Sequence, residues 1–132
     1  SIQTKGANGV TNISYSGVNR PLWIIRKDSK LLEEVKATKI AIGGLTQDNQ
    51  EFEQHDFQLK KGDTIYLSSD GYADQFGGPK RKKLMTGNFK DMLVKIQHLS
   101  INQQHDYLNT FIEDWMKDIE QVDDILVIGI RI

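Results

Sequence analysis

The chain has 132 residues, which fits one domain and leaves little room for a second. Its hydrophobic fraction of 38% suffices for a core, and its formal net charge of −1 gives no general attraction to nucleic acid or to an anionic membrane. Cysteine is absent, which excludes disulfides, thiolate zinc sites and a cysteine nucleophile, and which fits a cytoplasmic protein. No apolar run approaches the roughly 18 residues of a membrane span, so no membrane contact is expected.

The first half of the sequence predicts short strands separated by turns. β-branched and aromatic residues gather in runs, and glycine, proline and short polar clusters interrupt them. The predicted strands are Val10 to Tyr15, Leu22 to Arg26, its hairpin partner Leu31 to Val35, Phe52 to Leu59, and Thr64 to Ser69. Between the third and fourth of these strands, Gly43-Gly44 predicts a flexible break. After the last of them, Tyr72 to Gly87 is predicted to be an irregular stretch.

The second half changes to a helical period. Phe89, Met92, Leu93 and Ile96 recur at helical spacing, with Asn88 as the expected cap. A second helix is predicted to start at Ser100, because Ser100 and Gln103 have the spacing of a capping box. The apolar stripe of this second helix, which we interpret as core, consists of Leu108, Phe111, Ile112, Trp115, Met116 and Ile119.

The sequence closes on Ile125 to Ile130, an almost continuously apolar run typical of a central strand that is buried on both faces. Strands followed by two helices and a strand predict an α+β domain, with helices packed on a mostly antiparallel sheet.

Two acidic positions lie where strands end and begin. Asp70 follows a strong apolar strand, and Asp123-Asp124 precedes the last one. If these two strands are antiparallel neighbours, Asp70 and Asp123 converge at one edge of the sheet and form a hard oxygen-donor site of the kind that Mg²⁺ or Mn²⁺ prefers. Acidic residues at strand ends are more often turn formers or helix caps, so spacing alone leaves both interpretations open.

Four segments in order resemble a known family. They are Tyr15 to Leu22 (YSGVNRPL), Ile42 to Gly44, Leu59 to Tyr72 (LKKGDTIYLSSDGY) and Gln121 to Ile128 (QVDDILVI). Together they resemble the Tyr-x-Gly-x-Asn-x-Pro-Leu element, the glycine turn, the Gly-Asp turn leading to Ser-Asp-Gly, and the closing Asp-Asp motif of the metal-dependent protein phosphatases (PPM, type 2C). The similarity is to the SpoIIE/RsbU-like branch, and it implies a β-sandwich flanked by helices.

The resemblance implies roles for individual residues. Asp70 and Asp123 match metal-coordinating, and therefore catalytic, aspartates, while Asp124 stands where the family often has asparagine and is a supporting residue. Gly71 is expected to let the backbone turn sharply beside the metals. The cofactors implied are two Mn²⁺ or Mg²⁺ ions, which activate a water that attacks phosphoserine or phosphothreonine without a protein nucleophile.

One family element is missing from this sequence. Family members carry an earlier Asp-Gly, whose aspartate bridges both metals, and the residues before Tyr15 include only Gly6 to Gly9, without an acid. We therefore expect residues 1–132, which begin at Ser1 without a methionine, to be the later part of a phosphatase domain cut from a longer protein. This chain alone should be inactive or nearly so, and exposed apolar edges could pair with a second copy.

The run Lys80, Arg81, Lys82 and Lys83 is interpreted first as a solvated loop, because the chain as a whole is slightly negative. By resemblance it lies in a variable region near the substrate, where it could help to hold an anionic phosphoprotein. His55, His98 and His105 share no ligand-like spacing and are predicted to lie on the surface.

The leading hypothesis is a protein serine/threonine phosphatase domain in a bacterial signalling protein with sensory domains upstream. Its expected substrate is a phosphorylated regulatory partner such as an anti-anti-sigma factor, and nucleic acid is not expected to bind. The alternatives are a phosphatase-like binding module without catalysis, and a structural α+β domain whose Ser-Ser-Asp-Gly is only a turn.

Overall fold

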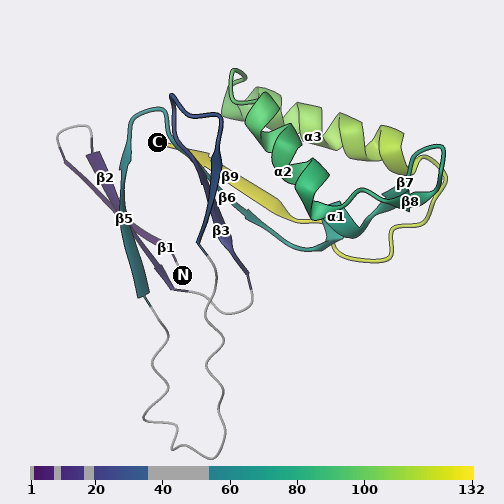
Figure 1. Cartoon of the computed structure of the whole chain (residues 1–132), viewed down its shortest axis with the longest axis horizontal. Helices are drawn as coiled ribbons and strands as arrows, with labels where there is room; N and C mark the ends of the chain where they lie inside the picture. The colour runs from purple at the N-terminus through teal and green to yellow at the C-terminus, as the bar shows by residue number, and fades with distance from the viewer. Residues whose placement is uncertain (1, 8–9, 17–19, 36–53) are drawn as a thin grey trace, which may run out of the picture.

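The computed structural model describes residues 2–7, 10–16, 20–35 and 54–132, with side chains described for 20–35 and 58–132. Two antiparallel sheets face each other, and helices cover the outer face of one of them (Figure 1). The first sheet has the order β1-β2-β5, from β1 (Ile2–Ala7), β2 (Val10–Ser16) and β5 (Gln54–Lys60). The predicted break at Gly43-Gly44 lies outside the described residues.

The second sheet has the order β4-β3-β6-β9 and carries the candidate site. It consists of β3 (Leu22–Ile25), β4 (Leu32–Val35), β6 (Thr64–Ser68) and β9 (Val127–Arg131). All its neighbours are antiparallel, and Leu22 lies opposite Leu67 while Ser68 lies opposite Val127. The predicted α+β class, with a mostly antiparallel sheet and helices against it, is confirmed.

Side chains alternate between two cores because successive residues of a strand point to opposite faces. Leu22 and Ile24 of β3 pack with Leu59 and Ile65 between the two sheets. Trp23 and Ile25, one residue along, pack instead with Tyr66 and the helices. This double burial explains why β3 is apolar at every position, with all four of its residues buried.

The helices follow β6 in the chain. The one-turn α1 (Gly71–Asp74) leads to a small hairpin of β7 (Phe76–Gly77) and β8 (Lys82–Lys83), then to α2 (Thr86–Lys95) and α3 (Ile101–Met116). The stretch predicted to be irregular therefore contains a helical turn and a hairpin. Within the described ranges, no helix is long and apolar enough to span a membrane.

The predicted capping box of α3 is confirmed, whereas the predicted cap of α2 is wrong. The Ser100 hydroxyl accepts a hydrogen bond from the Gln103 amide, and the Gln103 side chain accepts one from the Ser100 amide. At α2 the residue before the helix is Met85, with φ of 79°, and Asn88 lies inside the first turn. Asn88 donates to the Leu84 carbonyl at 2.8 Å, so its side chain supports the turn that precedes the helix.

The prediction that the last strand is central and buried on both faces is also wrong for the described part of the chain. β9 lies at the edge of its sheet, next to β6 alone. Ile128 is 44% exposed and Ile130 is 41% exposed, although both are large apolar residues. An apolar run suits either a central strand or an edge that another element covers, and sequence periodicity does not distinguish these cases.

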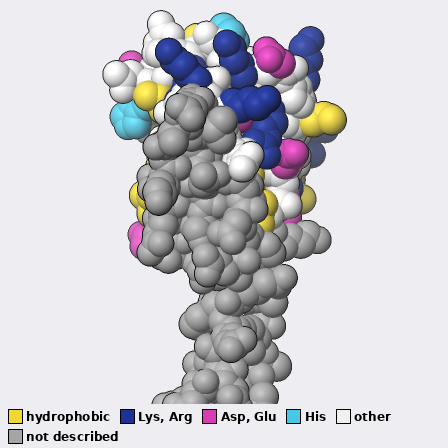
Figure 2. Space-filling model, turned by 90° about the vertical axis from the view of Figure 1, so that its left-hand side faces the viewer, with side chains coloured by type: hydrophobic (Ala, Val, Ile, Leu, Met, Phe, Trp, Pro, Cys, Tyr) yellow, Lys and Arg dark blue, Asp and Glu magenta, His cyan; other side chains and the backbone are white. Residues whose placement is uncertain are grey.

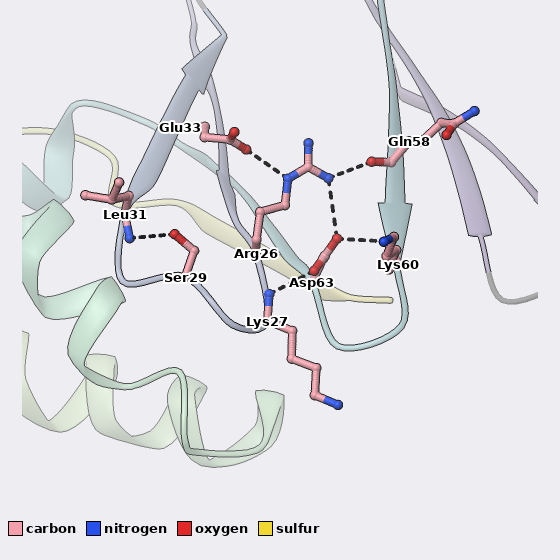
Figure 3. A network of polar contacts seen from close by, with 8 residues as sticks. All are labelled: Arg26, Lys27, Ser29, Leu31, Glu33, Gln58, Lys60 and Asp63. Carbon is pink, nitrogen blue, oxygen red and sulfur yellow. Dashed lines mark hydrogen bonds and ion pairs between the residues drawn. The ribbon is translucent and has the colours of Figure 1, made fainter.

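A buried carboxylate joins the turns at one end of the molecule (Figure 3). The Asp63 carboxylate accepts hydrogen bonds from the backbone amides of Lys27 and Lys60, both at 2.8 Å, and from the Arg26 guanidinium at 3.4 Å. Arg26 also donates to the Gln58 carbonyl and to Glu33. Asp63 thereby connects the β3–β4 turn to the β5–β6 turn and fixes the start of β6.

Candidate functional site

The end of β6 meets the beginning of β9 at one edge of the sheet. Ser69, just past β6, donates its backbone amide to the Leu126 carbonyl at 2.8 Å and its hydroxyl to the Asp124 carbonyl at 2.8 Å. The Leu126 amide donates back to the Ser69 hydroxyl at 2.9 Å. These three bonds hold the Asp70 segment against the segment that carries Asp123 and Asp124, as the sequence predicts.

Gly71 is required by this contact. A Cβ atom added at position 71 would lie 2.1 Å from the Asp124 carbonyl oxygen, well inside any allowed contact. The φ angle of Gly71 is not in the left-handed region, so a sharp turn is not what demands glycine here. The two backbones approach so closely that no side chain fits between them.

The three aspartates at this edge are exposed, and their carboxylates are donors of the type that Mn²⁺ and Mg²⁺ prefer. Asp70 occupies the N-cap position of α1 but makes no side-chain capping bond, and therefore its conformation is not explained by capping. Among the described residues, no group of three or more histidine, cysteine or acidic side chains is arranged to hold a metal ion. The donor chemistry fits the predicted ions, but these residues supply only part of a ligand set.

Two further residues at this edge were not predicted. Ser69 forms the link described above, and Arg20 places a cation nearby, with its guanidinium 3.4 Å from the Ser68 carbonyl. The signal for Arg20 lay in the strand pairing: Leu22 lies opposite Leu67, so a residue two positions before Leu22 falls beside the end of β6. Without the pairing, Arg20 is simply one residue of a turn.

The basic hairpin (residues 80–83) is exposed, and the residues before it pack against α3. Gly77 and Gly78 pack on Trp115 of α3, and Gly78, with φ of 74°, donates its amide to the Trp115 carbonyl at 3.0 Å. The Trp115 indole donates to the Gln75 carbonyl at 2.9 Å, and the Gln75 amide donates to the Glu120 carbonyl. Trp115, predicted as a core residue, therefore also anchors the basic hairpin.

The positive charge of the basic hairpin is mostly not neutralised within the described chain. Arg81 lies 3.9 Å from Asp118, and both side chains are highly exposed, so the pair contributes little. Lys83 lies above the Phe76 ring at 5.9 Å. The predicted surface positions of His98 and His105 are confirmed, and the side chain of His55 lies outside the described residues.

Two buried tyrosines lie between the sheet and the helices. The Tyr66 hydroxyl donates to Gln104, and the Tyr72 hydroxyl donates to the Leu108 carbonyl at 2.8 Å. Burial raises the pKa of Tyr66, and burial, with a smaller effect of Tyr107, raises the pKa of Tyr72. Both phenols serve the packing of α3 and lie outside the acidic edge.

Lysine and arginine side chains also gather at one end of the face shown in Figure 2. Separately, a polar hollow lies between the β3–β4 and β5–β6 turns, lined by Arg26, Lys27, Asp28, Ser29, Gln58, Lys60, Lys61 and Asp63. Its buried carboxylate, Asp63, is already bonded to three partners from two segments of the chain, Arg26 and Lys27 in one and Lys60 in the other. We therefore assign this hollow a structural role.

Comparison with solved structures places the fold among PP2C-type phosphatase domains. The PP2C domain of SiaA from Pseudomonas aeruginosa has a TM-score of 0.77 at 23% identity, over 93% of this chain and 50% of that one. The phosphatase domain of SpoIIE from Bacillus subtilis, presoaked with Mn, has a TM-score of 0.56 at 21% identity, over 100% of this chain and 56% of that one. A longer SpoIIE structure from Bacillus subtilis, with a fragment of the regulatory domain, has a TM-score of 0.60 at 23% identity. The match covers 93% of this chain and 34% of that one.

The profile of the Stage II sporulation protein E (SpoIIE) family matches residues 7–132, and the chain belongs to that family. It spans about half the length of the phosphatase domains that it resembles. A search of curated protein sequences finds no match.

Proposed function

We propose that this chain supplies the later half of a metal-dependent protein serine/threonine phosphatase domain. The observation that carries the proposal is the link through Ser69, which brings the Asp70-Gly71 and Asp123-Asp124 segments together at one sheet edge. Membership of the SpoIIE family supports the same function. A structural turn alone would not need two exposed carboxylate segments held against each other.

Asp70 and Asp123 are the residues that would hold Mn²⁺ or Mg²⁺. When bound, such ions activate water and neutralise charge on a phosphoryl group. The chain's own contribution is positional: Ser69 fixes the separation of the two segments, Gly71 permits their contact, and Asp124 supports the arrangement through its backbone carbonyl. Arg20, at the same edge, is suited to contact an anionic phosphoryl oxygen.

The proposed substrate is a phosphoserine or phosphothreonine on a regulatory partner protein, such as an anti-anti-sigma factor in the cytoplasm. Exposed cations in the basic hairpin support an anionic partner, because four successive residues there are lysine or arginine. Sensory domains in the parent protein would control the reaction. The chain alone is expected to release little or no phosphate, because the bridging aspartate of the family has no counterpart in this sequence.

The test measures metal binding by this chain directly. Paramagnetic Mn²⁺ broadens the NMR signals of nearby amides even at low occupancy, so a weak, incomplete site is still detectable. Titration with Mn²⁺ should broaden the amides of residues 69–72 and 123–126 together. Asp70→Asn and Asp123→Asn should each abolish the broadening in both segments, because each removes a carboxylate that would hold the ion.

Asp28→Asn is the matched control, because Asp28 is also exposed but lies in the β3–β4 turn. It should leave the broadening at the acidic edge unchanged. Broadening that follows every exposed carboxylate alike, Asp28 included, would contradict the metal role. The remaining candidate would then be a phosphatase-like module that binds a partner without catalysis, which the absence of a three-ligand cluster among the described residues also favours.

A further inference from the structure

The small hairpin of β7 and β8 has an inner face that packs on α3 and an outer face that does not. On the inner face Leu84 is buried, and a Cβ atom added at Gly77 would lie 2.2 Å from the Trp115 carbonyl oxygen. Successive residues of a strand point to opposite faces, so Phe76 and Lys83, which lie opposite each other, point away from α3. The inner face accounts for the packing of the hairpin, and its outer face needs a separate explanation.

The outer surface of the hairpin, formed by Phe76, residues 80–83 and Met85, combines apolar groups with cations. Phe76 is 38% exposed and Met85 is 59% exposed. The Lys83 ammonium lies 5.9 Å from the centre of the Phe76 ring, in a cation–π contact. Among the described residues, Asp118 is the one acid that pairs with the four cations, in an exposed contact of 3.9 Å. Aromatic residues, methionine and arginine are enriched at protein interfaces.

The backbone at both ends of β8 is strained by residues of this surface. Arg81 has a φ of 48°, and Met85 has a φ of 79° with a ψ of 144°. Such angles favour glycine, and residues with side chains are strained there. The Arg81 amide donates to the Gly78 carbonyl at 3.1 Å, and the Met85 amide donates to the Ala73 carbonyl at 2.8 Å. Glycine would make the same two bonds with less strain, so the turn geometry does not explain a cation and a methionine here.

The charges around this surface favour a short acidic segment of a protein over nucleic acid. Asp74 lies two residues before Phe76, and Asp118 lies beside Arg81. A long run of phosphates would approach these carboxylates and be repelled, and the chain as a whole has a net charge of −1. A short segment can place its carboxylates on the four cations and its apolar side chains on Phe76 and Met85.

We propose that the outer surface of the hairpin binds an acidic segment of a partner protein in which carboxylates alternate with apolar side chains. Because α1 leads directly from Asp70 to this surface, we identify the partner with the phosphoprotein substrate, and that identification rests on the proposed function. The binding itself requires neither metal nor phosphate release. Its failure would therefore leave the Mn²⁺ broadening at the acidic edge unaffected.

Fluorescence anisotropy without metal tests the binding. The probes are a labelled peptide of alternating glutamate and leucine, and a matched peptide with serine in place of each leucine. The wild-type chain should bind the leucine peptide about tenfold more tightly, because its apolar side chains leave water. Lys82→Glu combined with Lys83→Glu should weaken the binding of both peptides by about tenfold or more.

The matched control is Lys60→Glu combined with Lys61→Glu. It makes the same change in net charge at two exposed lysines, but these lie in the β5–β6 turn. It should change either dissociation constant by less than about twofold, because these lysines lie outside the proposed surface.

Two further variants separate binding from folding. Phe76→Ser should remove the preference for the leucine peptide, because the exposed ring is the proposed apolar contact. Met85→Gly relieves the strained backbone, so its midpoint of urea denaturation should be no lower than that of the wild type. The same variant should nevertheless bind the leucine peptide more weakly, which a purely structural role of Met85 does not predict.

The same titration should be repeated on the protein extended upstream through the rest of its domain, where the affinity should persist. Loss of binding in the extended protein would show that the parent's own chain covers this surface, and would overturn the proposal. Equal affinity for the two peptides, an equal loss in the control at positions 60 and 61, or tighter binding of a single-stranded oligonucleotide would overturn it as well.

Discussion

Ser69 and Gly71 determine how closely the two acidic segments approach. The Ser69 hydroxyl donates to the Asp124 carbonyl and accepts from the Leu126 amide. Gly71 leaves room for the Asp124 carbonyl. Neither residue is ionisable, yet the separation of Asp70 and Asp123 follows from them. At this scale the site depends on a missing Cβ atom as much as on its carboxylates.

Gly71→Ala is therefore expected to lower the free energy of unfolding by about 1 to 3 kcal/mol, as overpacking does elsewhere, because its Cβ meets a backbone oxygen. It should also uncouple the Mn²⁺ broadening of the two segments. Gly87→Ala in α2 is the control, because nothing lies within 4 Å of its added Cβ. The free energy of unfolding of that variant should rise by about 0.5 to 1 kcal/mol, because alanine has a higher helix propensity than glycine. Chemical denaturation of both variants measures the difference, and equal behaviour would contradict this account.

Turns, rather than strands, connect the two sheets at the element scale. Asp63 bonds to the amides of Lys27 and Lys60 and to Arg26, so two turns that are distant in sequence share one buried carboxylate. Ile132 also bonds to Asp63 through its backbone, which brings the end of β9 to the same point. Asp63 therefore fixes the start of β6, and the other end of this five-residue strand leads to Asp70.

Asp63→Asn should lower the free energy of unfolding by about 2 to 3 kcal/mol, because the amide group leaves at least one buried backbone donor without an acceptor. Asp28→Asn, an exposed change in the neighbouring turn, should alter it by less than about 0.5 kcal/mol. Urea denaturation followed by tryptophan fluorescence measures both. A loss for Asp63→Asn no larger than that for Asp28→Asn would show that the network is not a structural support.

At the scale of the whole molecule, the sequence predicted what local chemistry determines. Alternation, helical period and the Ser100–Gln103 spacing predicted β2, β3, β4, β5, β6 and β9, both long helices and the capping box, whereas β1 was not predicted. Apolar content alone could not predict that β9 is an edge, because burial depends on which elements lie beside it. The convergence of Asp70 and Asp123 was predictable from strand order, whereas Ser69 and Arg20 required the register. The β7–β8 hairpin was missed because it depends on Trp115, forty residues away from Gln75.

Alkaline pH should destabilise the whole domain through Tyr66 and Tyr72. Burial raises the pKa of both phenols above the ordinary value of about 10, so the folded chain keeps two protons that the unfolded chain releases. Their contribution is fully present below about pH 10, and the free energy of unfolding falls as the pH rises beyond it. Denaturant titrations at pH 8 to 11 should show this fall, and Tyr66→Phe with Tyr72→Phe should flatten it. Tyr107→Phe, at a 41% exposed position, should keep most of the fall; an equal slope in all variants would contradict the assignment.

The support of the basic hairpin has a thermodynamic consequence. Trp115, Gln75 and two packed glycines order residues 80–83 when the domain folds. If an acidic partner binds there, residues 80–83 would lose little conformational entropy on binding. The entropy cost of ordering would then fall almost entirely on the partner. Because the four cations are exposed, the strength of such binding is set by ionic strength, and it weakens as salt shortens the screening length.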